Sequence, residues 1–272
     1  MNKQALIQKA CNFLENCEDN YLKPEIAIED RMAGMRIYEA PLFGFGVAQD
    51  EHFVLLKKED AVGDHFMLPQ DWLPEARTVI SFFLPYTDAV RNSNRSEMRW
   101  PSGEWLHGRI EGQKVLNKLT KFLQDELIAA GFASIAPPLD ERIWSKQKPD
   151  DNDKYSFTSN WSERHVAFVC GLGTFGLSRG LITEKGMAGR FGSVITELAL
   201  SPTERKYEDV YEYCTLCGGC IRQCPVGAIS FDEGKDHTIC CDFLDVVKER
   251  FAPRYGCGKC QVGVPCETGI PG

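Results

Sequence analysis

Apolar residues recur three or four positions apart, the spacing of an amphipathic helix, in three stretches of this chain. The stretches cover residues 3–18, 115–127 and 238–251. Their apolar positions are Leu6, Ala10, Phe13, Leu14 and Cys17 in the first, Val115, Leu116, Leu119, Leu123 and Leu127 in the second, and Phe243, Leu244, Val247 and Phe251 in the third. Gly131 follows the second stretch, where glycine commonly ends a helix. The pattern predicts three helices that each bury one face.

Shorter apolar runs at residues 35–38 and 79–84 are typical of strands, and Pro85 closes the second run. A further helix is expected from Ser162 to a cap at Gly171, followed by a strand at 181–183. Cys170 on that helix is expected in the core. Because helices and strands follow each other in mixed order, the sequence predicts an α+β or α/β domain.

The glycines at 171, 173 and 176 match the G-x-G-x-x-G pattern of dinucleotide-binding turns. That interpretation requires a helix to begin at the glycines, so that its N-terminus meets the pyrophosphate. Residues 177–183 instead carry another glycine and no helical periodicity. We therefore expect no Rossmann site here.

Four cysteines stand in the spacing C-x2-C-x2-C-x3-C-P, the run with which bacterial ferredoxins bind [4Fe–4S] clusters. They are Cys214, Cys217, Cys220 and Cys224, followed by Pro225. In two-cluster ferredoxins the fourth cysteine ligates the other cluster, so a second ligand set is required. Cys257, Cys260 and Cys266 lie downstream of this run, and the pair Cys240-Cys241 lies between the two motifs.

Two [4Fe–4S] clusters would account for these ligands. One would take Cys214, Cys217, Cys220 and Cys266, and the other would take Cys224, Cys257, Cys260 and one cysteine of the pair at 240–241. Cys240 lies three and four residues before Phe243 and Leu244, on the inward face of the predicted helix, whereas Cys241 is turned about 100° away. We therefore expect Cys240 to be the ligand.

The composition describes an ordinary globular chain of 272 residues with a net charge of −8. No basic block indicates nucleic acid, no apolar run is long enough for a membrane span, and no signal peptide begins the chain. Twelve cysteines without an export signal favour metal ligation in the cytoplasm over disulfides, and no histidine stands at zinc spacing. The expected domains are residues 1–205, which bind a cofactor, and residues 206–272, which hold the clusters.

A second glycine-bearing segment, residues 185–193, precedes an apolar run at 194–200. Its backbone donors, with Arg190 and Ser193 nearby, could hold a flat cofactor with anionic or amide side groups. A glycine-rich turn with a surface arginine is the alternative, and composition alone favours it.

Ser162-Glu163-Arg164, the turn at 171–173, the segment at 186–193 and the cysteine array together resemble the epoxyqueuosine reductase-like family, which is grouped with the reductive dehalogenases. The resemblance implies a nitroreductase-like α/β sandwich domain that binds base-off cobalamin, and a ferredoxin-like domain whose two clusters reduce the cobalt. The cofactor contacts that it implies are Gly171, Gly173, Thr183, Arg190, Gly192 and Ser193. The nearest match to the base-on motif D-x-H-x-x-G, at Asp50 and His52, lacks the glycine, which agrees with a base-off cofactor.

The chain departs from this family in two places. Where epoxyqueuosine reductases carry an aspartate proton donor, this chain has Phe157, and no carboxylate stands between Asp153 and Glu163. Tyr155, His107 and Glu111 are of a suitable chemical type to replace it, although structural roles are the stronger interpretation for each. The chain also ends at Gly272 without the helical-repeat module of longer members, so tRNA is not the expected partner.

The sequence therefore favours a cytoplasmic, cobalamin-dependent iron–sulfur reductase of a small organic substrate, supplied with electrons by a ferredoxin or flavodoxin. Two alternatives stay open. The chain could be an electron-transfer protein whose large domain docks a partner or binds flavin, or it could be an epoxyqueuosine reductase that acts on tRNA.

Overall fold

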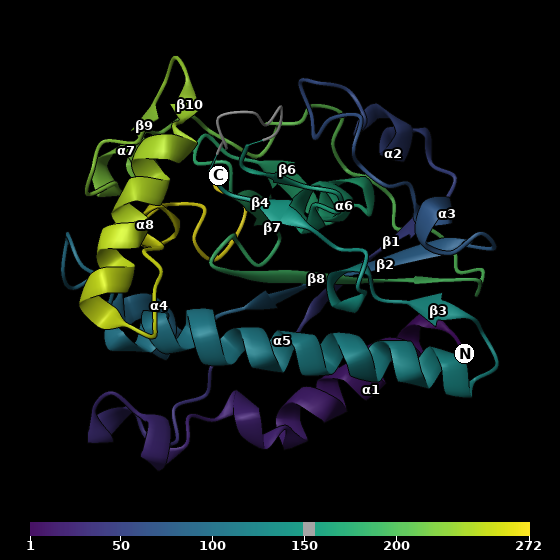
Figure 1. The fold of residues 1–272 in the computed structure, drawn as a ribbon, viewed down its shortest axis with the longest axis horizontal. Coiled ribbons are helices and arrows are strands. Elements are labelled where there is room, and N and C mark those ends of the chain that lie inside the picture. The colour runs from purple at the N-terminus through teal and green to yellow at the C-terminus, as the bar shows by residue number, and fades with distance from the viewer. Residues whose placement is uncertain (149–155) are drawn as a thin grey trace.

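A four-stranded antiparallel sheet forms the centre of the fold in the computed structural model, which describes residues 1–148 and 156–272 (Figure 1). Its strands are β1 (Leu42–Val47), β2 (Thr78–Pro85), β8 (Gly189–Thr196) and β3 (Ser134–Ile135), in the order β1-β2-β8-β3. β8 pairs along the whole of β2, from Thr78 opposite Thr196 to Pro85 opposite Gly189. The mixed α/β fold that the sequence predicts is confirmed, and its sheet is antiparallel.

The two faces of the sheet are covered by different helices. Ile80, Phe82 and Leu84 of β2 pack with α1 (Lys3–Asn16) and α5 (Gly103–Ala129), whereas Val79 packs on the other side with α6 (Glu163–Val169). Successive side chains of a strand point to opposite faces, so one apolar strand supplies both cores. Figure 1 shows α5 along one face of the sheet, with α1 outside it, and α6 on the opposite face.

Short elements complete the described part of the chain. The helices are α2 (Glu51–Leu55), α3 (Pro69–Trp72), α4 (Asp88–Ser93), α7 (Gly219–Gln223) and α8 (His237–Phe251). The 3-10 helices are Glu18–Asn20, Pro24–Ile26, Asp30–Met32, Pro137–Leu139 and Lys259–Gln261. Three strand pairs are β4 (Ser145–Lys146) with β5 (Thr158–Ser159), β6 (Gly173–Phe175) with β7 (Leu181–Thr183), and β9 (Ile229–Ser230) with β10 (Gly234–Lys235).

The predicted helices at 3–18, 115–127 and 238–251, the helix from Ser162 and the strands at 79–84 and 181–183 are all present. The strand predicted at 35–38 is wrong, because that segment makes only isolated bridges, from Arg36 to Tyr21 and from Tyr38 to Tyr86. Its backbone donors are divided among several partners, and the Tyr38 N–H bonds to the Asn20 side chain at 2.9 Å instead of a neighbouring strand. The sequence pattern does not predict strand β1.

Residues 171–176 do not begin a helix. Gly171 has a φ of +84° and follows the end of α6, and Gly173 opens strand β6. A Cβ on Gly173 would lie 1.8 Å from the carbonyl oxygen of Ile182 in the paired strand β7. These glycines therefore serve a helix end and a close strand pair, and the rejection of a Rossmann turn is confirmed.

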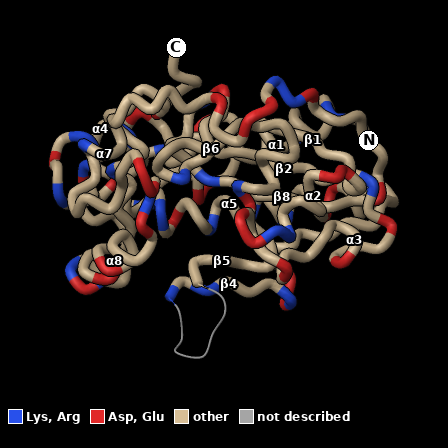
Figure 2. Tube along the Cα trace, turned by 90° about the horizontal axis from the view of Figure 1, so that it is seen from above, with Lys and Arg blue, Asp and Glu red and all other residues tan. Residues whose placement is uncertain are grey.

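Helices α7 and α8 and strands β9 and β10 lie at one end of α5 (Figure 1). Phe243 and Val247 of α8 pack on Leu106 of α5, and Trp100 stacks on Phe243 with ring centroids 5.8 Å apart. Figure 2 shows Lys and Arg interspersed with Asp and Glu over the described residues. No helix within residues 1–148 and 156–272 is long and apolar enough to cross a membrane.

Candidate cluster and cofactor site

Cys214, Cys217, Cys220 and Cys266, the first cysteine set, line one cavity. Gly218, with a φ of +68°, turns the chain between Cys217 and the start of α7, so that Cys220 returns toward its neighbours. Cys266 comes from the C-terminal tail, whose backbone accepts a hydrogen bond from Met187 N–H at 3.1 Å. The structure thus brings together the four cysteines that the sequence assigns to one cluster.

Cys224, Cys240, Cys257 and Cys260, the second cysteine set, line a different and larger cavity. Cys240 lies on the same inward face of α8 as Phe243 and Leu244, which line that cavity beside it. Cys241 is buried and does not line the cavity. The iron-binding role of both sets stays a prediction, but the four cysteines of each set line one cavity.

Trp105 of α5 and Asn94, directly after α4, hold the Cys257–Cys260 turn in place. Gly258 has a φ of +66°, and a Cβ there would lie 1.9 Å from ring atoms of Trp105. The Asn94 side chain donates to the Cys257 carbonyl at 3.0 Å, and Lys259, which is 1% exposed, donates to the Asn94 carbonyl at 2.7 Å. Only glycine fits at 258 without displacing the indole.

Burial favours the protonated thiol at four of the eight cysteines, Cys220, Cys257, Cys260 and Cys266, unless a cation binds. Burial raises the pKa of Cys220 to about 11 and the pKa of Cys257 and Cys266 to about 12, and neighbouring thiolates add to the rise. Within the described ranges, no three His, Cys, Asp or Glu side chains converge closely enough for a single metal ion. A cubane differs from a single ion because each thiolate binds a separate iron, so the sulfur atoms lie at the corners of a wider cage.

The cavity of the second cysteine set, here the central cavity, has a volume of about 410 Å³ and extends from these cysteines to strand β8. Arg109, Arg164, Arg190 and Lys235 all line it. Burial lowers the pKa of Arg109 and of Arg164, and the nearby charge of Arg190 lowers both further. The chain carries a net charge of −8, yet it gathers positive charge here, which suits an anionic group.

A second hollow, here the polar cavity, has a volume of about 380 Å³ and adjoins the first. Glu163, Arg164, Arg190 and Phe191 line both. Its far wall comes from successive turns of α5 through Gln113, Asn117 and Thr120. The sequence does not predict this wall, because polar residues three or four apart on an amphipathic helix are equally expected on a face toward solvent.

Glu163 is the carboxylate of the wall between the two cavities. Its Oε1 accepts a hydrogen bond from the Ser193 hydroxyl at 3.1 Å, and Ser193 in turn accepts from Trp161 Nε1 at 2.9 Å. The other carboxylate oxygen, Oε2, is buried and has no hydrogen-bond partner. Burial raises the pKa of Glu163 to about 7, against the lowering effect of the Ser193 hydrogen bond.

Only some of the six cofactor contacts that the resemblance implies lie at the two cavities. Arg190 and Gly192 line the cavities, and Ser193 lies behind them as the partner of Glu163. Gly171, Gly173 and Thr183 line neither cavity. Thr183 is fully buried and donates its hydroxyl to the Gly186 carbonyl at 2.8 Å, so its contacts are those of a turn.

Two of the three candidate proton donors, His107 and Glu111, lie in the described part of the chain. His107 is fully buried, and its Nε2 accepts from the Ile28 N–H at 3.1 Å, so its Nδ1 carries the proton donated to Glu111 at 2.8 Å. Glu111 is further held by Arg254 at 3.1 Å, which gives both residues a structural role. Tyr155 lies outside the described residues. Phe157 stacks on His237 with ring centroids 5.4 Å apart.

His52 does not approach either cavity. Its backbone N–H and its Nδ1 both contact Asp50, which is the N-cap of α2. Among the described residues, no histidine lines the central or the polar cavity. The Asp50-x-His52 pair is therefore a helix cap.

A family model and two kinds of reductase match parts of this chain. A family model described as a 4Fe-4S binding domain matches residues 207–230. A tetrachloroethene reductive dehalogenase of Desulfitobacterium hafniense is 39% identical over 69 residues, which cover 25% of this chain and 12% of that protein. An epoxyqueuosine reductase of Francisella cf. novicida (strain Fx1) is 30% identical over 122 residues, which cover 40% of this chain and 33% of that protein.

Solved structures extend the likeness over the chain. An epoxyqueuosine reductase from Streptococcus thermophilus has a TM-score of 0.54 at 18% identity, covering 100% of this chain and 68% of that one. The catabolic reductive dehalogenase NpRdhA has a TM-score of 0.53 at 12% identity, covering 98% of this chain and 37% of that one. At these identities the structural likeness concerns the fold. The chain is a homologue of the epoxyqueuosine reductases, with structural neighbours among the reductive dehalogenases and a 4Fe-4S binding domain in its C-terminal part.

Proposed function

We propose that the protein is an iron–sulfur reductase that binds two [4Fe–4S] clusters and cobalamin and reduces a small organic substrate. The observation that carries the proposal is the central cavity, which runs from four cysteines at one end to Glu163, Arg164 and Arg190 at the other. Electrons that enter at the cysteines would therefore reach the second hollow without leaving the chain.

The first cysteine set lies toward the C-terminal tail, and the second set opens into the central cavity. We infer that clusters held by the two cysteine sets would supply single-electron transfer from a low-potential donor, such as a ferredoxin or flavodoxin, toward the central cavity. Lys235 lines the cavity beside Cys240 and Cys260, where its charge would stabilise a cluster that becomes more negative on reduction.

The residues of the two cavities fit a flat cofactor that carries amide groups. Gln113 and Asn117 offer side-chain amides, Arg190 offers guanidinium donors, and Gly180, Gly189 and Gly192 leave backbone exposed to the cavities. Because no histidine of the described residues lines either cavity, the site fits a corrinoid without a protein imidazole ligand. When bound, such a cofactor supplies low-potential two-electron chemistry, while the chain binds and orients it.

The substrate class stays open between two kinds of molecule. Tetrachloroethene and 3-bromo-4-hydroxybenzoic acid are named with the dehalogenase relatives, and an epoxyqueuosine-modified tRNA stem loop is named with an epoxyqueuosine reductase. The two cavities, at about 410 Å³ and about 380 Å³, have the volumes of small-molecule sites. We favour a small organic substrate, and tRNA remains the second candidate because of the epoxyqueuosine reductase relatives.

Anaerobic purification followed by iron and cobalt analysis tests the proposal. The expected result is about eight irons per chain and one corrinoid bound after incubation with hydroxocobalamin. Eight irons with no corrinoid under any condition would leave an electron-transfer protein instead. Fewer than about four irons would contradict both functions.

A further inference from the structure

We propose that Glu163 is the proton donor of the reaction, in place of the aspartate that Phe157 replaces; this inference rests on the proposed function. Glu163 Oε2 is buried without a hydrogen-bond partner in the wall that the central and polar cavities share. A carboxylate oxygen in that position is satisfied when it carries a proton and donates it to a group in the cavity. The other oxygen is fixed, so the proton is directed to one side.

The support around Glu163 is rigid. Ser193 lies on β8 and is fully buried, and its hydroxyl donates to Glu163 Oε1 at 3.1 Å. Trp161 Nε1 donates to the same hydroxyl oxygen at 2.9 Å, which orients the Ser193 proton toward Glu163. These two hydrogen bonds hold Oε1 and leave Oε2 as the carboxyl oxygen without a protein partner, as a positioned general acid requires.

The charged groups around Glu163 are compatible with this role. Arg164, next in α6, and Arg190, on β8, line the same two cavities, and the Cys170 thiol at the end of α6 lies within electrostatic range of Glu163. Arg164 donates to the Arg179 carbonyl at 2.6 Å and Arg190 donates to Gln113, so neither forms an ion pair with Glu163. Burial therefore dominates, and it holds the pKa of Glu163 at about 7, where a carboxyl can give and regain a proton at neutral pH.

Electrons, protons and bonds balance when the reaction is a reductive cleavage. A low-potential ferredoxin or flavodoxin would supply two electrons, and clusters held by the two cysteine sets would transfer them one at a time. For 3-bromo-4-hydroxybenzoic acid the carbon–bromine bond breaks, bromide leaves with an electron pair, and a carbon–hydrogen bond forms with the proton from Glu163 Oε2. Water then returns a proton to the carboxylate.

Infrared difference spectra between acidic and alkaline pH, recorded on the cluster-loaded protein, test the protonation without any substrate. We expect a protonated carboxyl band that disappears as the pH rises through about 7 and that is missing in Glu163→Gln. Glu184→Gln, at an exposed carboxylate paired with Lys206, is the matched control and should keep the band. A protein with no such band holds Glu163 ionised, and the proposal is then wrong.

Turnover tests the role itself, with 3-bromo-4-hydroxybenzoic acid as the probe and bromide release as the readout. We expect Glu163→Gln to keep its iron and corrinoid but to lose about 100-fold or more in rate, with partial recovery in Glu163→Asp. The wild-type rate should fall as the pH rises above about 7, and this limb should vanish in Glu163→Gln. An unchanged rate and pH profile in Glu163→Gln would overturn the inference. Failure of the wild-type protein to bind corrinoid would instead overturn the proposed function.

Discussion

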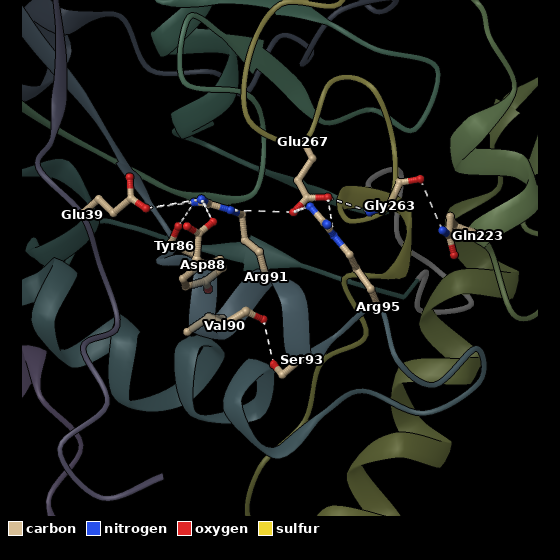
Figure 3. Close-up of polar contacts among 10 residues, drawn as sticks. All are labelled: Glu39, Tyr86, Asp88, Val90, Arg91, Ser93, Arg95, Gln223, Gly263 and Glu267. Carbon is tan, nitrogen blue, oxygen red and sulfur yellow. Dashed lines mark hydrogen bonds and ion pairs between the residues drawn. The ribbon is translucent and has the colours of Figure 1, made fainter. Parts of the chain in front are cut away.

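The carboxylate of Glu267 receives two hydrogen bonds from the guanidinium of Arg95, at 3.0 Å from Nε and 2.6 Å from Nη2 (Figure 3). Glu267 is 3% exposed and follows Cys266 directly in the chain. The Gly263 N–H donates to the same carboxylate at 2.7 Å, and Arg91 Nε lies 3.7 Å from it. The residue after the last cysteine of the first set is thereby fixed to the segment that follows α4.

We expect Arg95→Gln to lower the free energy of unfolding by about 1–2 kcal/mol, since Arg95 is half-exposed and the buried carboxylate would keep only its weaker partners. The tail that carries Cys266 would loosen, so iron should be lost faster to a chelator. Thermal unfolding and chelator kinetics measure both effects. Lys121→Gln, which breaks an exposed pair with Asp125 on α5, is the control and should cost below about 0.5 kcal/mol. Equal effects of the two changes would contradict the anchoring role.

Cys240 and Cys241 are neighbours on α8, and only Cys240 lines the central cavity. Cys240→Ala is expected to lower the iron content from about eight to about four per chain, because one cluster loses a ligand. Cys241→Ala should keep about eight, at a modest cost in packing. Iron analysis and the electron paramagnetic resonance spectrum of the reduced protein distinguish the two variants. Loss of a cluster in Cys241→Ala alone would show that the ligand choice is wrong.

Gly258 and Gly227 offer a matched pair of left-handed glycines near the cysteines, with φ values of +66° and +65°. A Cβ at Gly258 would meet the Trp105 ring, whereas a Cβ at Gly227 would meet nothing within 4 Å. Gly227→Ala should therefore cost only about 1 kcal/mol of backbone strain. Gly258→Ala adds an overpacking cost of about 1–3 kcal/mol and should displace the Cys257–Cys260 turn. Thermal unfolding together with iron content measures the difference, and similar losses in both variants would argue against the contact with Trp105.

The raised pKa of Glu163, at about 7, makes stability depend on pH in a definite direction. A folded-state pKa above the unfolded value contributes stability that is present below the unfolded pKa and is lost as the pH rises through the folded pKa. The unfolding temperature of the wild type should therefore fall relative to that of Glu163→Gln between about pH 5 and about pH 8. His165, whose pKa burial lowers to about 4, titrates in both proteins and cancels in the comparison. A difference that is independent of pH would contradict the shift.

Local patterns in the sequence predicted the three longest helices and the central strand β2, because helical periodicity, glycine caps and apolar runs act over a few neighbouring residues. The helices at 3–16, 103–129 and 237–251 and the central strand β2 are where the pattern puts them. β1 was missed because Gly44 and Gly46 interrupt its apolar residues. The structure explains both glycines, since a Cβ on Gly44 would lie 2.5 Å from the Cys170 carbonyl oxygen and one on Gly46 would lie 3.0 Å from the Cys170 Sγ.

The sequence by itself determined the cysteine array and the choice of Cys240 over Cys241 as the side chain that faces the cavity, since both depend on spacing within a turn or a helix. Only the tertiary structure decided which residues surround the cofactor cavities. Gln113 of α5, Glu163 of α6 and Arg190 of β8 are up to 77 residues apart in the chain, and no local pattern relates them. Their meeting follows from the packing of two helices on opposite faces of one antiparallel sheet, which is a long-range property.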